Sequence, residues 1–350
     1  MPLSEYVTLG RSGLRVSPLC FGTMTFGTEW GWGADEETCG QLLETYLQAG
    51  GNFLDTADLY TLGKSEEICG RLIRDRGLRD RIVLATKFSF NAERRNPNAG
   101  GNGRKNIYRA IEGSLRRLQT DYIDLYWMHI WDGTTPVEEV VDSMNDLVRS
   151  GKVRYVGFSD VPAWYAARAQ TIAQFAPSER IIALQLEYSL VERAIEREHI
   201  PAAHELGMGI CPWSPLASGF LAGKYKRGEK GGGRLDTMNA SGNPGFEKFT
   251  DRNWSILDVL LEVAKEIGRP AAEVTLNWVA TQPGISSVII GATKPSQLES
   301  NLRSLDFTIP AELRARLDEA GKPETAHPYM MFEAPFPDMI NGGVTVRGWK

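Results

Sequence analysis

The chain has 350 residues, of which 42% are hydrophobic and 24% charged, as in an ordinary folded globular protein. The net charge of −5 gives no basic surface for nucleic acid, and no Lys/Arg cluster indicates an anionic membrane partner. No apolar run approaches the roughly 18 residues of a membrane span, and the first residues lack a signal-peptide pattern. The four cysteines lie far apart without a C-x-x-C pair, which is typical of reduced, packed thiols, so we expect a cytoplasmic protein.

Short β-rich runs alternate with helical stretches along most of the chain. At the start, Tyr6–Thr8 and Leu14–Ser17 flank a Gly-rich turn and predict a β-hairpin. The expected strands that follow are Leu19–Gly22, Asn52–Asp55, Ile82–Lys87, Ile123–Met128, Val153–Phe158, Ala183–Glu187, Gly209–Trp213 and Ser286–Ile290. The expected helices between them include Glu36–Gln48, Ser65–Arg74, Asn106–Leu118, Pro136–Arg149, Pro162–Phe175 and Ile195–Glu205.

This alternation predicts an α/β fold with parallel strands and right-handed crossovers. Because the strands read as apolar runs, eight such units favour a closed (β/α)8 TIM barrel over an open doubly wound sheet. We expect one domain over residues 1–350. A long loop, Ser214–Asp251, follows the seventh strand, and residues 322–350 form a tail rich in Pro and aromatic residues that we expect to pack over one barrel mouth.

Four residues able to move a proton lie at or just after the ends of expected strands. Asp55, Lys87 and His129 end successive strands, and Tyr60 lies a few residues beyond Asp55. Each has an ordinary explanation alone, such as a helix cap or a solvated strand end. In a barrel, however, all four face the mouth where active sites are built. A tyrosine has a pKa near ~10, which a neighbouring ammonium lowers, so a Tyr–Lys pair makes a usable proton donor.

Other motifs are weaker. His199 and His204 are five residues apart and do not share a helix face, so we predict no metal site there. The glycine runs 100–103 and 231–233 match neither the dinucleotide-binding fingerprint nor a P-loop, and a flexible loop is the better interpretation.

The sequence resembles the aldo-keto reductase family from about Tyr6 to Leu317. The resemblance rests on the runs Gly51–Tyr60, Leu84–Lys87, Leu125–His129, Val156–Ser159, Leu184–Tyr188, Pro212–Tyr225 and Ile289–Asn301. It implies that Tyr60 donates a proton to a carbonyl oxygen and that Lys87 lowers the pKa of Tyr60. It also implies that Asp55 holds Lys87 and that His129 orients the carbonyl, while a nicotinamide cofactor gives hydride to the carbonyl carbon.

The resemblance also implies a cofactor site. Ser159 and Gln185 would bind the nicotinamide carboxamide, and Trp213 would stack on the ring. Because Lys294 stands at a helix start, where a 2′-phosphate binds well, NADPH is favoured over NADH. The full expected set is Thr23, Met24, Asp55, Ser159, Asp160, Gln185, Trp213, Ser214, Pro215, Leu216, Ser218, Gly219, Lys224, Arg234, Gly291, Thr293, Lys294, Gln297 and Asn301.

The sequence differs from the usual pattern of the family at three positions. Asp160 stands where many members carry an uncharged residue, Ser300 where a carboxylate often helps to hold adenine, and Gly291 where the mammalian steroid and aldose reductases carry a phosphate-binding lysine. Gly291 and the long segment after Trp213 together make the chain resemble the aryl-alcohol-dehydrogenase and potassium-channel-β branches. Channel subunits usually carry Asn at the position of His129, so a working reductase is favoured over the alternative, a redox-sensing regulatory subunit with residual activity.

The substrate is expected to be a small carbonyl compound. Four aromatic residues in the loops suggest a pocket for aryl or polycyclic carbonyls, although packing that anchors the loops explains them equally well. They are Trp30, Trp32, Phe88 and Trp131. The physiological substrate, the direction of reaction and the oligomeric state stay open.

Overall fold

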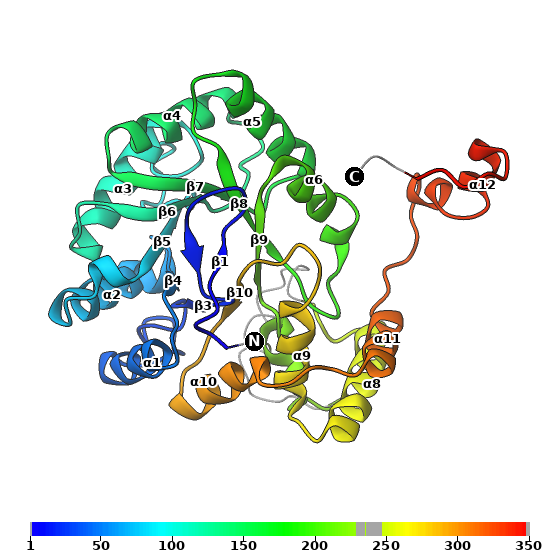
Figure 1. The fold of residues 1–350 in the computed structure, drawn as a ribbon. Coiled ribbons are helices and arrows are strands. Elements are labelled where there is room, and N and C mark those ends of the chain that lie inside the picture. The colour runs from blue at the N-terminus through cyan, green and yellow to red at the C-terminus, as the bar shows by residue number, and fades with distance from the viewer. Residues whose placement is uncertain (1, 229–234, 236–246, 348–350) are drawn as a thin grey trace.

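A computed structural model describes residues 2–228, 235 and 247–347, and its centre is a barrel of parallel strands (Figure 1). Eight strands pair in the order β10-β3-β4-β5-β6-β7-β8-β9. The ring is completed where Ile210 of β9 bridges Ile285, just before β10, with the Ser286 amide donating to the Ile210 carbonyl at 2.8 Å. This confirms the expected (β/α)8 barrel. The strands are β3 (Leu19–Gly22), β4 (Phe53–Asp55), β5 (Val83–Phe88), β6 (Ile123–Met128), β7 (Val153–Ser159), β8 (Ile181–Glu187), β9 (Gly209–Trp213) and β10 (Val288–Ile290).

Helices surround the barrel, and their sequence signals act as expected. Asp35 accepts a hydrogen bond from the Thr38 amide at the start of the first helix, while Pro136 and Pro162 immediately precede two others. The expected helix Ile195–Glu205 is shorter than predicted, because its first residues form a separate 3₁₀ turn. The helices are α1 (Glu36–Gln48), α2 (Lys64–Asp75), α3 (Arg104–Leu118), α4 (Val137–Arg149), α5 (Ala163–Phe175), α6 (His199–Leu206), α8 (Asp251–Ile267), α9 (Ala271–Ala280), α10 (Pro295–Leu302), α11 (Ala311–Ala320) and α12 (Phe336–Asn341).

The barrel interior is filled by every second residue of the strands, as the two-residue period of a strand requires. Trp127 of β6 is its largest member and lies over Gly157 of β7, where an added Cβ would come within 2.4 Å of the indole ring. The expected N-terminal hairpin, β1 (Val7–Thr8) and β2 (Arg15–Val16), is present. Its Val16 packs with the side chains that fill the barrel interior. The Arg11 amide donates to the carbonyl of Gly207, just before β9, so the hairpin closes the end at which the strands begin.

The described part of the C-terminal tail contacts the rest of the chain at a few residues. In Figure 1 its described residues run outward from α11, and α12 lies clear of the barrel. The Arg197 guanidinium bonds the Glu324 carbonyl, and the Tyr329 hydroxyl bonds Glu198, so the first part of the tail is tied to the start of α6. Met339 and Ile340 are 70% and 80% exposed. That the tail packs over a barrel mouth stays a prediction.

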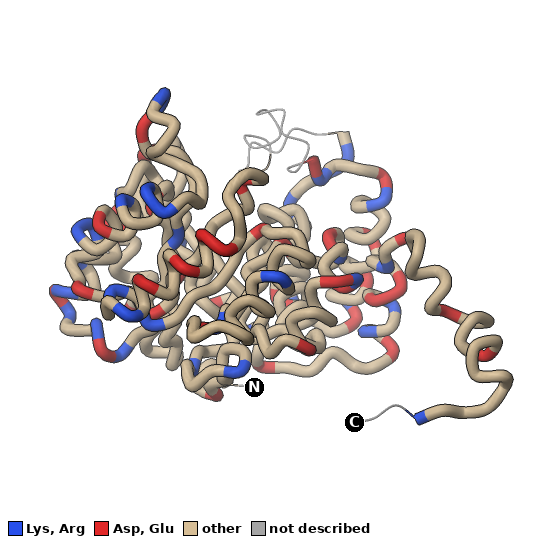
Figure 2. The backbone as a smooth tube through the Cα atoms, turned by 90° about the horizontal axis from the view of Figure 1, so that it is seen from above, with Lys and Arg blue, Asp and Glu red and all other residues tan. Residues whose placement is uncertain are grey.

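Charged residues of both signs are mixed over the barrel surface (Figure 2). All four cysteines are buried and reduced, as expected. Among the described residues, the helices are too short or too polar to cross a bilayer.

Candidate active site

The strand period that fills the barrel interior also positions the expected catalytic side chains. Phe53 of β4 points into the barrel interior, so Asp55, two residues later, points inward as well. On β5, Ala85 points inward and Lys87, two residues later, does the same. Both polar residues form the last inward layer, at the end where the strands finish. At this end of the barrel, the apolar side chains of the interior are followed by a polar site.

Lys87 is the centre of this site. Its side chain is fully buried and its ammonium forms an ion pair with Asp55. The same Nζ donates to the Thr56 carbonyl at 2.8 Å and to the Tyr60 hydroxyl at 3.1 Å. His129 completes the group, since its ring lies edge-on to Tyr60 with the ring centroids 5.9 Å apart. The structure thus brings all four predicted residues together.

The protonation states of Lys87 and His129 follow from their surroundings. Burial works against the Lys87 ammonium, but the Asp55 carboxylate and then Tyr60 more than offset it, so the pKa of Lys87 is raised. Burial, and then the charge of Lys87, hold the pKa of His129 well below its usual range. His129 is therefore neutral at physiological pH. Its Nδ1 is buried and lacks a hydrogen-bond partner among the described residues.

A strained turn holds Tyr60 against Lys87. The next two residues, Thr61 and Leu62, have left-handed backbones with φ of 47° and 57°, which is costly for side chains with a Cβ. The Thr61 hydroxyl donates to the Phe26 carbonyl at 2.8 Å and accepts from the Ser65 amide at 3.0 Å. Thr61 therefore ties the Tyr60 turn both to the loop after β3 and to the start of α2.

Sequence reasoning missed a buried acid, Asp58, two residues before Tyr60 in the chain. The Asp58 amide donates to the Lys87 carbonyl at 3.2 Å, and its carboxyl Oδ1 is buried without a hydrogen-bond partner in the described part of the chain. Burial, and then the carboxylate of Glu66, raise the pKa of Asp58 to about 7, against the opposing charge of Arg117. An acidic residue in a polar loop gives no sequence signal of such burial.

Aromatic side chains surround the mouth, with one correction to the expected set. The Trp30 ring lies 6.4 Å from Tyr60 and 5.5 Å from Trp32, between centroids. Phe88, by contrast, is fully buried and packs on Tyr126 in the layer between strands and helices, because it alternates with the inward-facing Lys87. Phe90 takes the expected place: it is 37% exposed and lies 4.7 Å from His129.

The fourth expected pocket residue, Trp131, lies one loop further round the barrel. Its ring packs against Trp164 at 5.7 Å and Tyr165 at 6.1 Å, between centroids. Trp131 therefore has aromatic neighbours of its own that anchor it, as the packing alternative for this residue anticipates.

Across the mouth from the tetrad lie the residues expected to meet a nicotinamide. Gln185, at the end of β8, donates to Asp55 Oδ1 at 3.1 Å, and Ser159 is its strand partner on β7. Trp213, at the end of β9, donates from Nε1 to Asp160 Oδ1 at 3.0 Å. Of the expected carboxamide and stacking residues, Gln185 therefore contacts the tetrad directly, whereas Trp213 contacts Asp160.

The segment after Trp213 is a tight turn of left-handed residues whose amides bond within the turn. Ser214, Ala217, Ser218 and Gly219 have positive φ, and the amides of Ala217 and Gly219 donate to the carbonyls of Ser214 and Leu216 at 2.8 and 2.9 Å. The Ser218 amide donates to the Ser214 hydroxyl at 2.9 Å. A Cβ built on Gly219 would lie 3.5 Å from the ammonium of Lys224. Pro215 and Leu216 belong to the same segment, whereas Arg234 lies outside the described residues.

The residues expected to hold the adenosine end lie within α10 and just before it. Lys294 is exposed and occupies the residue before this helix, and Gln297 accepts hydrogen bonds from the amide and the hydroxyl of Thr293. Asn301 donates to the Gly291 carbonyl at 3.1 Å. Ser300 donates to Glu273 of α9 at 2.9 Å, so α9 supplies a carboxylate beside a position where α10 has none.

Thr23 and Met24 lie in the loop after β3. Thr23 is fully buried, and its hydroxyl is bonded to the Asp55 carbonyl and to Ser65 of α2, at 3.1 and 2.9 Å. It therefore faces the α2 side, while Met24 is half-buried.

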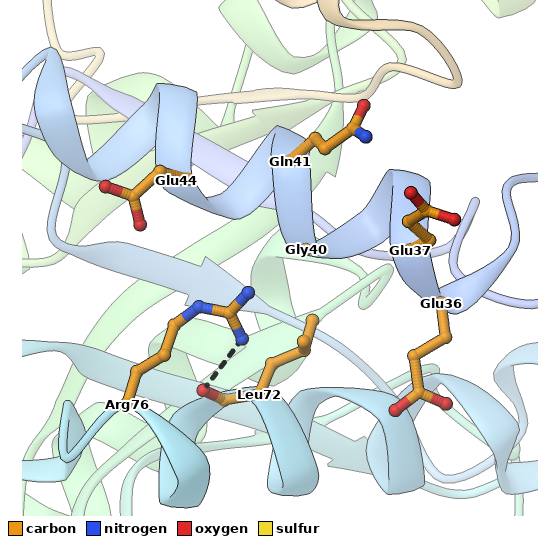
Figure 3. Close-up of a pocket in the computed structure, with 7 residues that line it drawn as sticks. All are labelled: Glu36, Glu37, Gly40, Gln41, Glu44, Leu72 and Arg76. Carbon is orange, nitrogen blue, oxygen red and sulfur yellow. Dashed lines mark hydrogen bonds between the residues drawn. The ribbon is translucent and has the colours of Figure 1, made fainter.

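The hollow shown in Figure 3 is a different feature. It is an open groove of about 620 Å³ between α1 and α2, lined mainly by Glu36, Glu37, Glu44 and Arg76. No tetrad residue lines it, and it lies on the outer helical layer. Within the described residues, no cluster of His, Cys, Asp and Glu has the arrangement of a metal site.

Comparison with known proteins agrees with this geometry. The model of the Aldo/keto reductase family matches residues 18–322. The uncharacterized oxidoreductase YrpG of Bacillus subtilis is 37% identical over 90% of this chain and 95% of its own length. A probable voltage-gated potassium channel subunit beta of Oryza sativa is 37% identical over 86% and 91%, and an aryl-alcohol dehydrogenase [NADP(+)] of Phanerodontia chrysosporium is 33% identical over 91% and 86%.

The chain belongs to the aldo/keto reductase family. It is an oxidoreductase that acts on carbonyl or alcohol groups, and its substrates are small carbonyl compounds or the corresponding alcohols.

Proposed function

We propose that this protein is an NADPH-dependent reductase that converts aryl or other bulky aldehydes and ketones to alcohols, with Tyr60 as the proton donor. The observation that carries the proposal is the hydrogen bond from Lys87 to the Tyr60 hydroxyl, with Asp55 fixing the buried ammonium. An ammonium in this position stabilises the phenolate that remains after Tyr60 gives up its proton.

Each member of the tetrad has one task in this scheme. Tyr60 protonates the carbonyl oxygen, and Lys87 stabilises the resulting phenolate. Asp55 holds Lys87 in its charged form, and neutral His129 hydrogen-bonds the carbonyl and orients it. A bound nicotinamide cofactor supplies the hydride for the carbonyl carbon.

The residues present fit such a cofactor. The turn from Ser214 to Gly219 lies close to the ammonium of Lys224, which suits a pyrophosphate, and Lys294 at the start of α10 suits a 2′-phosphate. Trp213 and Gln185 would hold the nicotinamide end beside Asp55. The name of the aryl-alcohol dehydrogenase relative includes NADP(+), which supports NADPH as the cofactor.

The direct test is to mix purified protein with NADPH and 4-nitrobenzaldehyde and to follow the loss of reduced-nicotinamide absorbance. We expect turnover, and no turnover with a panel of aryl carbonyls would contradict the proposal. Lys294→Ala should weaken NADPH much more than NADH. An equal effect on both would contradict a 2′-phosphate role.

The alternative is a nucleotide-binding regulatory subunit, which the channel-subunit relative suggests. Both functions predict NADPH binding, but only the first predicts multiple turnovers. We favour the reductase because His129 stands in contact with Tyr60, where its neutral imidazole can hold a carbonyl.

A further inference from the structure

One carboxyl group at the barrel mouth has no part in the proton transfer described above. Asp160 follows Ser159 at the end of β7 and is half-buried. Its carboxyl Oδ1 accepts a hydrogen bond from Trp213 Nε1 at 3.0 Å, so the carboxyl group is held beside the indole that is expected to stack on the nicotinamide.

The backbone of Asp160 is held as firmly as its side chain. Its amide donates to the Gln185 carbonyl at 3.1 Å, and its carbonyl accepts from the Trp131 amide at 3.2 Å. Its φ is +43°, a left-handed conformation that Asp and Asn adopt more readily than most residues. Three neighbouring strand ends thus fix the position of this carboxyl group.

We infer that Asp160 makes the site bind NADP⁺ more tightly relative to NADPH than an uncharged residue would, through the attraction between its carboxylate and the positively charged oxidised nicotinamide ring. This inference rests on the proposed function. Loss of a hydride leaves the ring with a positive charge that the reduced ring lacks. A carboxylate held beside Trp213 therefore stabilises one redox form and not the other.

The other charges near Asp160 differ from it in being paired. Glu187 of β8 forms an ion pair with Lys248 at 2.9 Å, and Lys87 of β5 is paired with Asp55. Among the residues that the structure describes, the Asp160 carboxyl has the Trp213 indole as its side-chain hydrogen-bond partner and forms no ion pair. A cationic ring beside Trp213 can therefore pair with the Asp160 carboxylate, whereas Glu187 and Lys87 already have partners.

The effect should depend on pH. Burial raises the pKa of Asp160 to about 7; Glu187 adds to the rise, whereas the Trp213 hydrogen bond and Lys87 oppose it. Below this pH the carboxyl is increasingly neutral and the preference is lost. Above it the preference is complete.

The test measures cofactor affinities without turnover. The Kd values of NADPH and NADP⁺ are measured by fluorescence or calorimetry at pH 6 and pH 8.5 for the parent and for Asp160→Asn, which keeps the shape and tolerates the left-handed backbone. At pH 8.5 we expect the ratio Kd(NADPH)/Kd(NADP⁺) to fall about tenfold in the variant, as removal of one nearby charge predicts. A tenfold ratio makes the bound couple more reducing by about 30 mV.

Two controls separate the possible results. Asp142→Asn makes the same change in net charge at an exposed position on α4 and should leave the ratio unchanged. Adenosine 2′,5′-diphosphate, which lacks the nicotinamide, should bind parent and Asp160→Asn equally. If both cofactors bind and the ratio is the same in parent and variant, or both Kd values move together, the inference is wrong. If neither cofactor binds the parent, the proposed function itself fails.

Discussion

The buried ammonium of Lys87 lies 3.1 Å from the hydroxyl of Tyr60, and Asp55 pairs with that ammonium. The three residues come from two adjacent strands and the loop that follows one of them. A charge buried in this way is stable only with its partner, so stability and activity depend on the same contacts.

The ion pair between Lys87 and Asp55 can be tested by removing one or both charges. Lys87→Met leaves the Asp55 carboxylate buried without its cation, so we expect a loss of about 3–5 kcal/mol in the free energy of unfolding. The double variant Asp55→Asn/Lys87→Met should recover most of this loss in urea unfolding, yet remain at least about 100-fold slower in kcat. Equal stability of the single and double variants, or an active double variant, would contradict the assignment.

The left-handed turn after Tyr60 predicts a stabilising substitution. Leu62 is 76% exposed and has a φ of 57°, where its Cβ is unfavourable. Because Asn tolerates this conformation, Leu62→Asn should raise the free energy of unfolding by about 0.5–1 kcal/mol. Leu62→Ala removes the same exposed side chain but keeps the unfavourable Cβ, so it should give no such gain. A matching gain in both variants would show that the backbone is not the cause.

Asp58 predicts a pH-dependent stability. Its folded pKa of about 7 lies above the unfolded value, so the folded state holds a proton that the unfolded state has released. Asp58 therefore costs stability increasingly as pH rises from about 4 to 7. Asp58→Asn should raise the free energy of unfolding by about 1–2 kcal/mol at pH 8.5, after allowance for screening, and by much less at pH 4.5.

A suitable control for this measurement is Asp121→Asn, at an exposed position. It should show no such difference between the two pH values. A gain for Asp58→Asn that is the same at both pH values would show that burial of the charge is not its source.

Phe90 predicts a preference for aromatic substrates. The centroid of its ring lies 4.7 Å from the centroid of the His129 ring at the mouth. Loss of the Phe90 ring would remove apolar contact area and ring packing from a bound aromatic substrate. Phe90→Ala should raise KM for an aryl aldehyde about tenfold and change KM for a short aliphatic aldehyde much less. Phe175→Ala is the matched control, because Phe175 is the exposed last residue of α5. A uniform rise for both substrates would argue against a direct contact.

Much of the barrel and the tetrad was predictable because both depend on local periods. Parallel strands with a two-residue period place Asp55, Lys87 and the neighbouring Gln185 in one inward layer. The expectation that Phe88 lines the substrate pocket is wrong, because Phe88 follows the inward-facing Lys87 and successive strand residues face opposite sides. A strict two-residue period excludes Phe88 from the pocket.

Features that depend on long-range packing were not predictable. The burial of Asp58 results from segments that pack on it from elsewhere in the chain. The hydrogen bond from Trp213 to Asp160 joins two strand ends, and no sequence motif links these two residues. The contacts of the tail with Arg197 and Glu198 likewise join segments far apart in the chain, and its composition does not indicate them.

Tyr60→Phe tests the central claim most directly, because it removes only the hydroxyl that Lys87 contacts. NADPH binding, followed by fluorescence titration, should stay within about twofold, while the rate of carbonyl reduction in a single turnover should fall by at least about 100-fold. Reduction by the variant at the parent's rate would show that Tyr60 is not the proton donor.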